Sequence, residues 1–175
     1  MEPNEALRSV TGVDATQHGF DEFWAGHRDR LCRALALTLG DAQLAADAVD
    51  EAMARAYQRW DHVSSLTAPA GWVFHVALNW SRSFLRRARR QPPAWLSPAF
   101  SAPTEVAEPT VDAALAALPV DQRAVVVCRL LLQMSEADTA AALAVPAGTV
   151  KSRLSRATSR LSESLSHLDP KEVQR

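Results

Sequence analysis

The stretch SEADTAAALAVPAGTVKSRLSRATSRL, residues 135–161, decides the fold of this chain. Its first part predicts a short helix of small residues, because Ser135 and Asp138 form a capping pair at a helix start. Ala144-Val145-Pro146 interrupts the helical pattern, and a second helix is expected from Thr149 to Leu161. Two short helices joined by a tight turn make a helix-turn-helix.

The outward face of the second helix offers only cationic and hydroxyl side chains: Thr149, Lys151, Ser152, Arg153, Ser155, Arg156 and Arg160. Arginine binds the edge of guanine through two hydrogen bonds, and serine or threonine contacts phosphate or base. No acid occurs between Lys151 and Ser162, which favours a polyanion-binding face over an ordinary solvated one. Arg153 and Arg156 are the strongest candidates for base-specific contact.

Upstream, apolar residues recur at helical spacing in three further segments. They predict helices over about 20–39, 42–60 and 70–90, with a loop over 61–70 and a flexible tail over 1–18. Gly40 suits the end of the first helix and Asp41 the cap of the second. The third helix carries Trp80, which we expect in the core rather than as a platform for stacking bases.

Residues 92–109 hold five prolines and no basic residue, which predicts a linker. Trp95 and Phe100 within it are either anchors for a partner or locally packed. Beyond it, the run VVVCRLLL at 125–132 fits a buried strand or a helix. We expect helix, because a lone strand would have no partner. The expected fold is all-α: two small helical domains joined by a proline-rich linker.

The net charge of −1 conceals two basic islands in an acidic chain. Residues 80–91 hold five arginines and no acid, and residues 123–175 hold eight bases and five acids. This pattern indicates two local contacts with a polyanion and only weak binding to free DNA, because net charge drives non-specific affinity.

Other classes of protein find little support. The five histidines lie in different predicted elements, without a nucleophile elbow, phosphate loop or metal-ligand spacing, so we expect no enzyme, cofactor or metal site. Cys32 and Cys128 lie far apart and are expected to be reduced. No secretory signal or membrane-spanning run is visible, which predicts a cytoplasmic protein.

Taken together, these segments resemble the extracytoplasmic-function (ECF) sigma factors of bacterial RNA polymerase. FDEFWAGHRDRLCRALALTLGD (20–41), DAVDEAMARAYQRWD (47–61) and APAGWVFHVALNWSRSFLRRARR (68–90) resemble region 2 of that family. LAALPVDQRAVVVCRLLLQMSEADTAAAL (115–143) and VPAGTVKSRLSRA (145–157) resemble its region 4. The resemblance implies these divisions: a tail at 1–18, region 2 at 19–91, a linker at 92–110, region 4 at 111–168 and a tail at 169–175.

The resemblance also implies partners and sites. Region 4 would bind the minus-35 promoter element through the helix-turn-helix face given above. Region 2 would bind and open the minus-10 element through Ser64, Ser65, Asn79, Arg82, Arg86, Arg87, Arg89 and Arg90. It would bind core RNA polymerase through Asp47, Asp50, Glu51 and Arg55. Many members of the family are held inactive by an anti-sigma factor, so such a partner is a further hypothesis.

The chain departs from the family pattern at several positions. Ala144 and Gln133 stand where glycine is common, Thr139 replaces an aliphatic residue, Ser83 a frequent aspartate, and Asp50 a usual glutamine. If Ala144 needs a positive φ, its side chain costs about 1 kcal/mol.

Two other readings of the sequence stay open. A stand-alone helix-turn-helix regulator would bind operator DNA without polymerase, but it leaves the first half of the chain unexplained. An adaptor bundle that binds another protein would be indifferent to charge reversal at Arg153 and Arg156.

Overall fold

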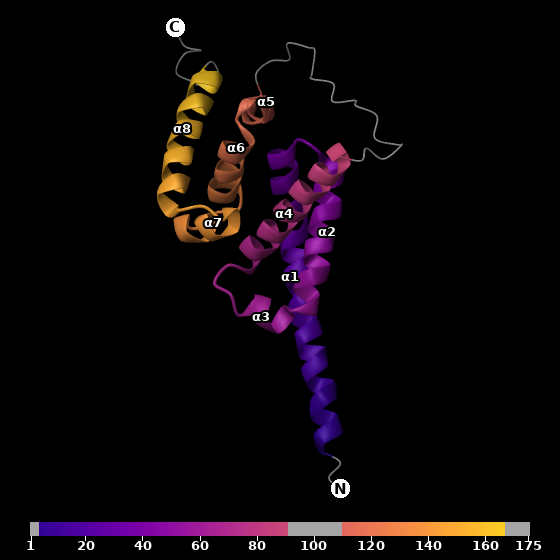
Figure 1. Cartoon of the computed structure of the whole chain (residues 1–175). Coiled ribbons are helices and arrows are strands. Elements are labelled where there is room, and N and C mark those ends of the chain that lie inside the picture. The colour runs from indigo at the N-terminus through magenta and orange to yellow at the C-terminus, as the bar shows by residue number, and fades with distance from the viewer. Residues whose placement is uncertain (1–3, 91–109, 167–175) are drawn as a thin grey trace.

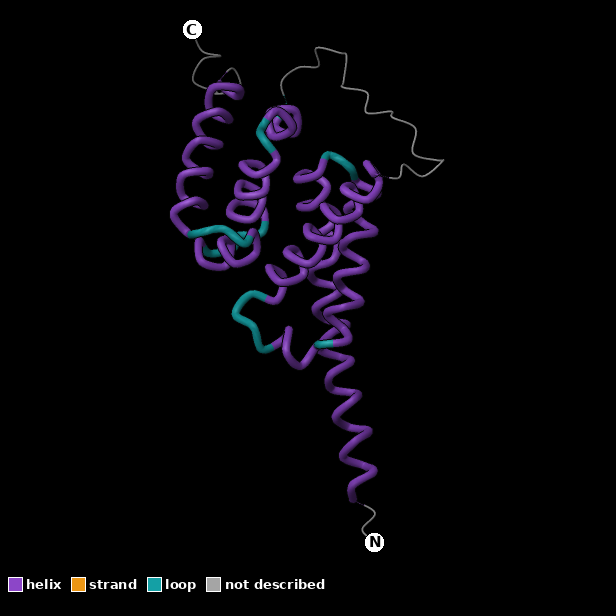
Figure 2. The backbone as a smooth tube through the Cα atoms, in the orientation of Figure 1, coloured by secondary structure: helices purple, strands orange, loops and turns teal. Residues whose placement is uncertain are grey.

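The computed structural model describes residues 4–90 and 110–166, with side chains for residues 17–88 and 110–166 (Figure 1). The described residues form helices joined by short loops, and no strand occurs among them (Figure 2). The predicted all-α class with two helical regions is therefore confirmed. Most of the predicted linker lies outside the described residues, including Trp95 and Phe100, and so does the predicted tail at 169–175.

The first region contains four helices, α1 (Asn4–Leu39), α2 (Ala42–Gln58), α3 (Trp60–Ser64) and α4 (Pro69–Arg90). Gly40 ends α1 with a φ of 77°, a conformation that glycine adopts without steric cost. The Asp41 side chain caps α2 by accepting a hydrogen bond from the Leu44 backbone N–H at 2.9 Å. Both predictions for this turn are confirmed.

Two expectations for this region are wrong. Residues 4–18, expected as a flexible tail, form the first half of α1. No proline interrupts the chain from Asn4 to Leu39, and a helix already nucleated gains one hydrogen bond for each residue it adds. The loop expected over 61–70 is shorter, because α3 continues to Ser64 and buries Trp60 and Val63.

The second region contains α5 (Val111–Ala117), α6 (Val120–Val126), a π-helical turn η1 (Val127–Leu131), α7 (Glu136–Leu143) and α8 (Ala147–Leu165). The run at 125–132 is helical, as expected, although it widens into the π-turn. α8 begins two residues before the predicted Thr149, directly after Pro146.

The two regions pack against each other around one hydrophobic core (Figure 1). α1, α2 and α4 supply the larger part of this core, and α6, η1 and α7 close it from the second region. A smaller cluster around Leu115, Leu118, Val126 and Ala157 attaches α5 and α8. The described helices include none that is long and apolar enough to cross a membrane.

Candidate nucleic-acid interface

The predicted helix-turn-helix is present as α7 and α8. The Ser135 hydroxyl caps α7 by accepting a hydrogen bond from the Asp138 backbone N–H at 3.0 Å. α7 ends at Ala144, which has φ 53° and ψ 47°, and the Val145 N–H reaches back to the Ala140 carbonyl at 3.0 Å. These bonds satisfy the carbonyls at the end of α7 and set the angle at which α8 leaves the turn.

Ala144 and Gln133 are the two non-glycine residues with positive φ in the described part of the chain, at 53° and 55°. Both are positions where the sequence departs from the family's common glycine. A left-handed conformation costs an L-residue roughly 1–2 kcal/mol. Both turns therefore form without glycine, and each carries backbone strain at its residue with positive φ.

α8 presents its predicted polar face to solvent. Its apolar side is buried at Val150 and Ala157 and half-buried at Leu154 and Leu161. Five predicted residues are exposed: Lys151, Ser152, Ser155, Arg156 and Arg160. The Arg156 guanidinium donates to the Ser152 carbonyl at 3.1 Å and to the Ser152 hydroxyl at 3.2 Å, so it lies along the helix surface.

The other two predicted residues of α8, Thr149 and Arg153, are half-buried. Arg153 forms an ion pair with Asp121 of α6, with 2.9 Å between Nη2 and Oδ2. Its side chain is 24% exposed. Arg153 therefore turns toward the body of region 4, whereas Arg156 stays on the free surface.

The predicted minus-10 residues lie on α3 and α4. Asn79, Arg82, Arg86 and Arg87 are exposed along α4. Ser64 and Ser65 are exposed at the end of α3, where their hydroxyls donate to the carbonyls of Asp61 at 3.3 Å and His62 at 2.7 Å. Arg89 and Arg90 belong to the last turn of α4, but their side chains lie outside the described residues.

A groove of about 420 Å³ runs along this part of α4. It is lined by Arg55, His75, Val76, Asn79, Trp80, Ser83 and Arg87. Trp80 packs against the core, as expected, but it is only partly buried and also lines the groove. Its ring stacks on Phe84 with 5.4 Å between ring centroids and 10° between ring planes. Cations and aromatic faces in one groove are the features that bind single-stranded nucleic acid.

The predicted polymerase-binding residues lie on α2. Asp47, Glu51 and Arg55 point outward, with Glu51 paired to Arg55 at 2.7 Å and Asp47 accepting from Gln43 at 2.9 Å. Asp50 instead receives two hydrogen bonds from Arg28 of α1, at 2.7 and 2.8 Å.

These two hydrogen bonds, which Arg28 donates to Asp50, are the main reason that the pKa of Arg28 is raised above its ordinary value. The Arg28 guanidinium also lies 5.6 Å from the centroid of the Trp24 ring. Asp50, which stands where the family usually has glutamine, is therefore paired with Arg28.

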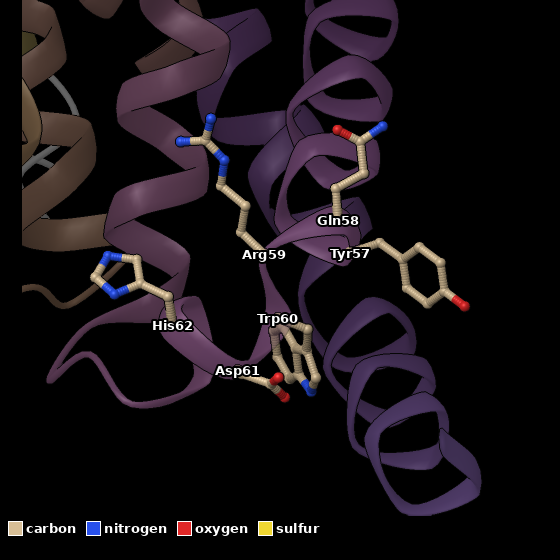
Figure 3. A pocket seen from close by; sticks show the side chains of 6 residues that line it. All are labelled: Tyr57, Gln58, Arg59, Trp60, Asp61 and His62. Carbon is tan, nitrogen blue, oxygen red and sulfur yellow. The ribbon is translucent and has the colours of Figure 1, made fainter. Parts of the chain in front are cut away.

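A second cavity, of about 490 Å³, lies where α2 meets α3 (Figure 3). Its lining residues are Tyr57, Gln58, Arg59, Trp60, Asp61 and His62. Figure 3 shows their polar groups pointing apart, so they do not converge on a common point as the groups of a catalytic site do. Among the described residues, no three His, Cys, Asp or Glu side chains gather as metal ligands.

Sequence reasoning missed Arg123, which is buried in α6. Its guanidinium donates to the carbonyls of Ala116 and Leu118 in its own region, at 2.6 and 2.9 Å, and to those of Leu37 and Thr38 in α1, at 3.4 and 3.3 Å. The sequence signal for a buried role is the position of Arg123 directly before the apolar run that begins at Ala124. The carbonyls that it binds were not predictable, because they come from distant segments.

One helical region carries a groove with cationic side chains, and the other exposes a cationic face of α8 that has no acid from Lys151 to Ser162. Family models agree with this division: Sigma-70 region 2 matches residues 23–91, and Sigma-70, region 4 matches residues 110–161. The chain belongs to the ECF sigma factors of RNA polymerase. As predicted, it is a sigma factor and not an enzyme.

Two similar proteins are named as RNA polymerase sigma factors. The chain is 33% identical to the ECF RNA polymerase sigma factor SigM of Mycobacterium tuberculosis, over 96% of this chain and 88% of that protein. It is 36% identical to the RNA polymerase sigma-E factor of Streptomyces avermitilis, over 86% of this chain and 87% of that protein.

Among solved structures, the fold resembles the sigma factor RpoE of Bartonella quintana, which was crystallised with the anti-sigma factor NepR. The TM-score is 0.67 at 24% identity, covering 85% of this chain and 97% of RpoE.

Proposed function

We propose that α8 binds the minus-35 element in the major groove, through Thr149, Lys151, Ser152, Arg153, Ser155, Arg156 and Arg160. The observation that carries this proposal is the exposed face of α8, which is cationic and has no acid from Lys151 to Ser162. Arg156 is the base reader, because it is exposed, and Arg153 acts by fixing α8 on α6.

In region 2, the groove along α4 binds the single strand of the opened minus-10 element. Asn79, Arg82, Arg86 and Arg87 line or flank its path, Arg89 and Arg90 extend the cationic run, and Ser64 and Ser65 lie at the loop that precedes α4. Unstacking a base costs a few kcal/mol, which stacking on an aromatic ring and a cationic track offset. Trp80 supplies the ring, and Arg87 is a cation that lines the same groove.

Core RNA polymerase binds the outer face of α2 through Asp47, Glu51 and Arg55, with Asp50 holding α2 against α1. The protein works in the cytoplasm, where polymerase and chromosome lie. An anti-sigma factor regulates it. Purification from the native source without a stoichiometric partner would argue against that regulation.

Run-off transcription with bacterial core polymerase on a promoter library tests the proposal. We expect initiation from a shared two-element sequence only when this protein is present, and loss of initiation when Arg156 and Arg160 are reversed in charge. Specific binding to a free duplex, without initiation or polymerase binding, would favour a stand-alone regulator. Activity that is unchanged by the charge reversal would favour an adaptor.

A further inference from the structure

A row of aromatic and charged side chains follows the outer junction of α1 and α2. From α1 it contains Phe20, Trp24 and Arg28, which recur at every fourth residue and therefore lie on one side of the helix. From α2 it contains Asp50 and Tyr57, which are about two helical turns apart. We call these five residues the aromatic seam.

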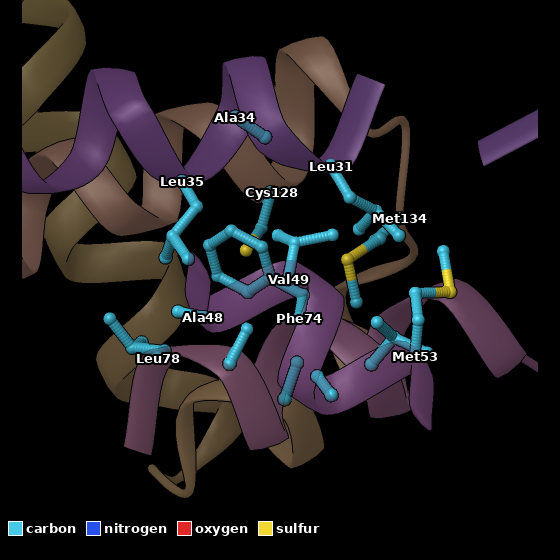
Figure 4. Packing of buried hydrophobic residues seen from close by; sticks show 14 of the residues in the cluster. Leu31, Ala34, Leu35, Ala48, Val49, Met53, Phe74, Leu78, Cys128 and Met134 are labelled. Atoms are coloured by element: carbon cyan, nitrogen blue, oxygen red, sulfur yellow. The ribbon is translucent and has the colours of Figure 1, made fainter. Parts of the chain in front are cut away.

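The two helices that carry the aromatic seam are fixed in the hydrophobic core. On their inner sides, Leu31 and Leu35 of α1 and Val49 and Met53 of α2 are fully buried (Figure 4). Because this packing holds both helices, the residues of the seam keep their relative positions without a partner. A surface that is rigid before binding loses little conformational entropy on association.

Contacts between rings hold the aromatic part of the seam in place. The centroid of the Phe20 ring lies 5.0 Å from that of Tyr57 and 6.0 Å from that of Trp24. Phe20 is 8% exposed, Trp24 is half-buried and Tyr57 is 49% exposed. Phe20 therefore forms the floor between two rings that reach solvent. Figure 3 shows the Tyr57 hydroxyl directed away from α2.

Arg28 continues the seam beyond Trp24. Its guanidinium lies 5.6 Å from the centroid of the Trp24 ring and donates to both carboxylate oxygens of Asp50, at 2.7 and 2.8 Å. Asp50 is thereby occupied within the protein and contributes to the seam by holding Arg28. Tryptophan, tyrosine and arginine are the residue types enriched where protein–protein interfaces bind most strongly.

Acids surround the aromatic seam. Asp21 and Asp29 of α1 and Asp47 of α2 are exposed beside it, and the arginine of the seam is already paired. A strand of DNA would be repelled here, because nucleic-acid binding depends on cations that neutralise phosphates. The complementary surface belongs to a protein that places an apolar side chain between the two exposed rings and basic side chains around it.

The seam is continuous with the face of α2 through which the chain is proposed to bind core polymerase. Asp47 belongs to that face, and Asp50 of the seam lies about one helical turn further along α2. We propose that the aromatic seam is the energetic centre of the polymerase interface, where a polymerase segment inserts an apolar side chain between Trp24 and Tyr57. Basic side chains of that segment meet the surrounding acids. This inference rests on the proposed polymerase-binding function of α2.

Tyr57 gives the most direct test, because its ring is exposed. In the full-length protein, Tyr57→Ala should weaken equilibrium binding to core polymerase at least about tenfold, as expected at the centre of an interface. Tyr57→Phe should stay within about twofold of wild type, because the ring makes the contact. Leu85→Ala is the matched control, since Leu85 is 36% exposed on α4, and it should leave the affinity unchanged. Thermal unfolding verifies that each variant is folded.

Charge reversal tests the basic surroundings of the inserted side chain. Asp21→Lys should weaken polymerase binding several-fold and reduce its dependence on salt, because it replaces attraction by repulsion. Asp112→Lys, at an exposed position of α5 outside the seam, is the control and should change neither quantity. Unchanged affinity in Asp21→Lys would contradict the basic partner surface.

A photo-cross-linking residue locates the contact in the assembled holoenzyme. p-Benzoylphenylalanine in place of Tyr57 should cross-link to a segment of a polymerase subunit, and the same residue in place of Leu85 should not reach that segment. Cross-linking from position 57 to promoter DNA instead of polymerase would overturn the proposal.

Two patterns of affinity separate this inference from the function on which it rests. Unchanged affinity in Tyr57→Ala, together with a loss in Glu51→Arg, would overturn the role of the seam and leave the polymerase-binding face of α2 intact. Unchanged affinity in both variants would contradict the proposed function of that face, and the role of the seam with it.

Discussion

Arg153 of α8 and Asp121 of α6 form an ion pair of 2.9 Å that links the recognition helix to the helix behind it. The arginine is 24% exposed and the aspartate 48%. This ion pair distinguishes Arg153 from Arg156, although the sequence alone makes both equal candidates for base-specific contact. Arg153 is half-buried against α6, whereas Arg156 remains exposed on the surface of α8.

Arg156→Ala should therefore weaken binding to particular base pairs of the minus-35 element, by about 1–3 kcal/mol at each position that it reads. Arg153→Ala should weaken binding almost equally across sequences. Competition binding of holoenzyme to a library of minus-35 variants measures both. A base-specific loss for Arg153→Ala, as large as that for Arg156→Ala, would contradict this division.

A double-mutant cycle at Arg153 and Asp121 tests the pair itself. Because both groups are partly exposed, solvent screening limits the coupling to about 1 kcal/mol or less. Thermal unfolding of wild type, both alanine variants and the double variant gives this coupling. Additive losses would show that the pair contributes nothing.

Glycine at either strained turn should stabilise the protein. Ala144→Gly and Gln133→Gly each relieve a left-handed conformation and should raise the free energy of unfolding by up to about 1 kcal/mol. Ala141→Gly, at an exposed position inside α7, is the control and should lower it by about as much. Urea denaturation measures all three, and destabilisation by Ala144→Gly would rule out strain at the turn.

Trp80→Ala should impair promoter opening more than promoter binding. Its ring lines the groove on α4 and stacks on Phe84. We expect less permanganate-reactive thymine in the open complex, with minus-35 binding unchanged and partial recovery in Trp80→Phe. Leu85→Ala, an exposed neighbour on the same helix, should leave opening intact. Equal loss of opening in both variants would argue against a stacking role.

Asp50→Ala should cost stability rather than polymerase affinity, because Asp50 is engaged by Arg28. We expect a loss of about 1 kcal/mol or less for this partly exposed pair. Glu51→Arg should instead reduce affinity for core polymerase with little change in thermal stability. Pull-down of core polymerase together with thermal unfolding distinguishes these outcomes, and a strong affinity loss in Asp50→Ala alone would reverse the assignment.

Alkaline pH should lower the free energy of unfolding, because the Cys128 thiol is buried in the core. Burial raises the pKa of its thiol to about 12, above the value of 9.0 for an exposed thiol. The unfolded chain therefore loses this proton first, so stability is complete below pH 9 and declines as the pH rises toward 12. A Cys128→Ala variant should show a smaller decline between pH 8 and 10, and an identical decline would place the effect elsewhere.

Local sequence patterns predicted correctly those turns and caps that depend on neighbouring residues. The turn at Gly40-Asp41, the cap at Ser135 and the break after Leu143 depend on conformational preferences within a few positions, so their signals lie in the sequence itself. The wrong expectations lie where propagation or packing overrides local pattern, as in residues 4–18 of α1 and in α3. The individual DNA- and polymerase-binding residues stay predictions.

The sequence by itself determined the helical class, the two regions and the helix-turn-helix, because periodicity and capping are local properties of a chain. Its resemblance to known region 2 and region 4 segments indicated the sigma-factor family. Only the tertiary structure decided that Arg153 turns inward to Asp121, that Asp50 is held by Arg28, and that region 4 closes over region 2. These contacts join residues from separate helices, and the fold alone brings such residues within bonding distance.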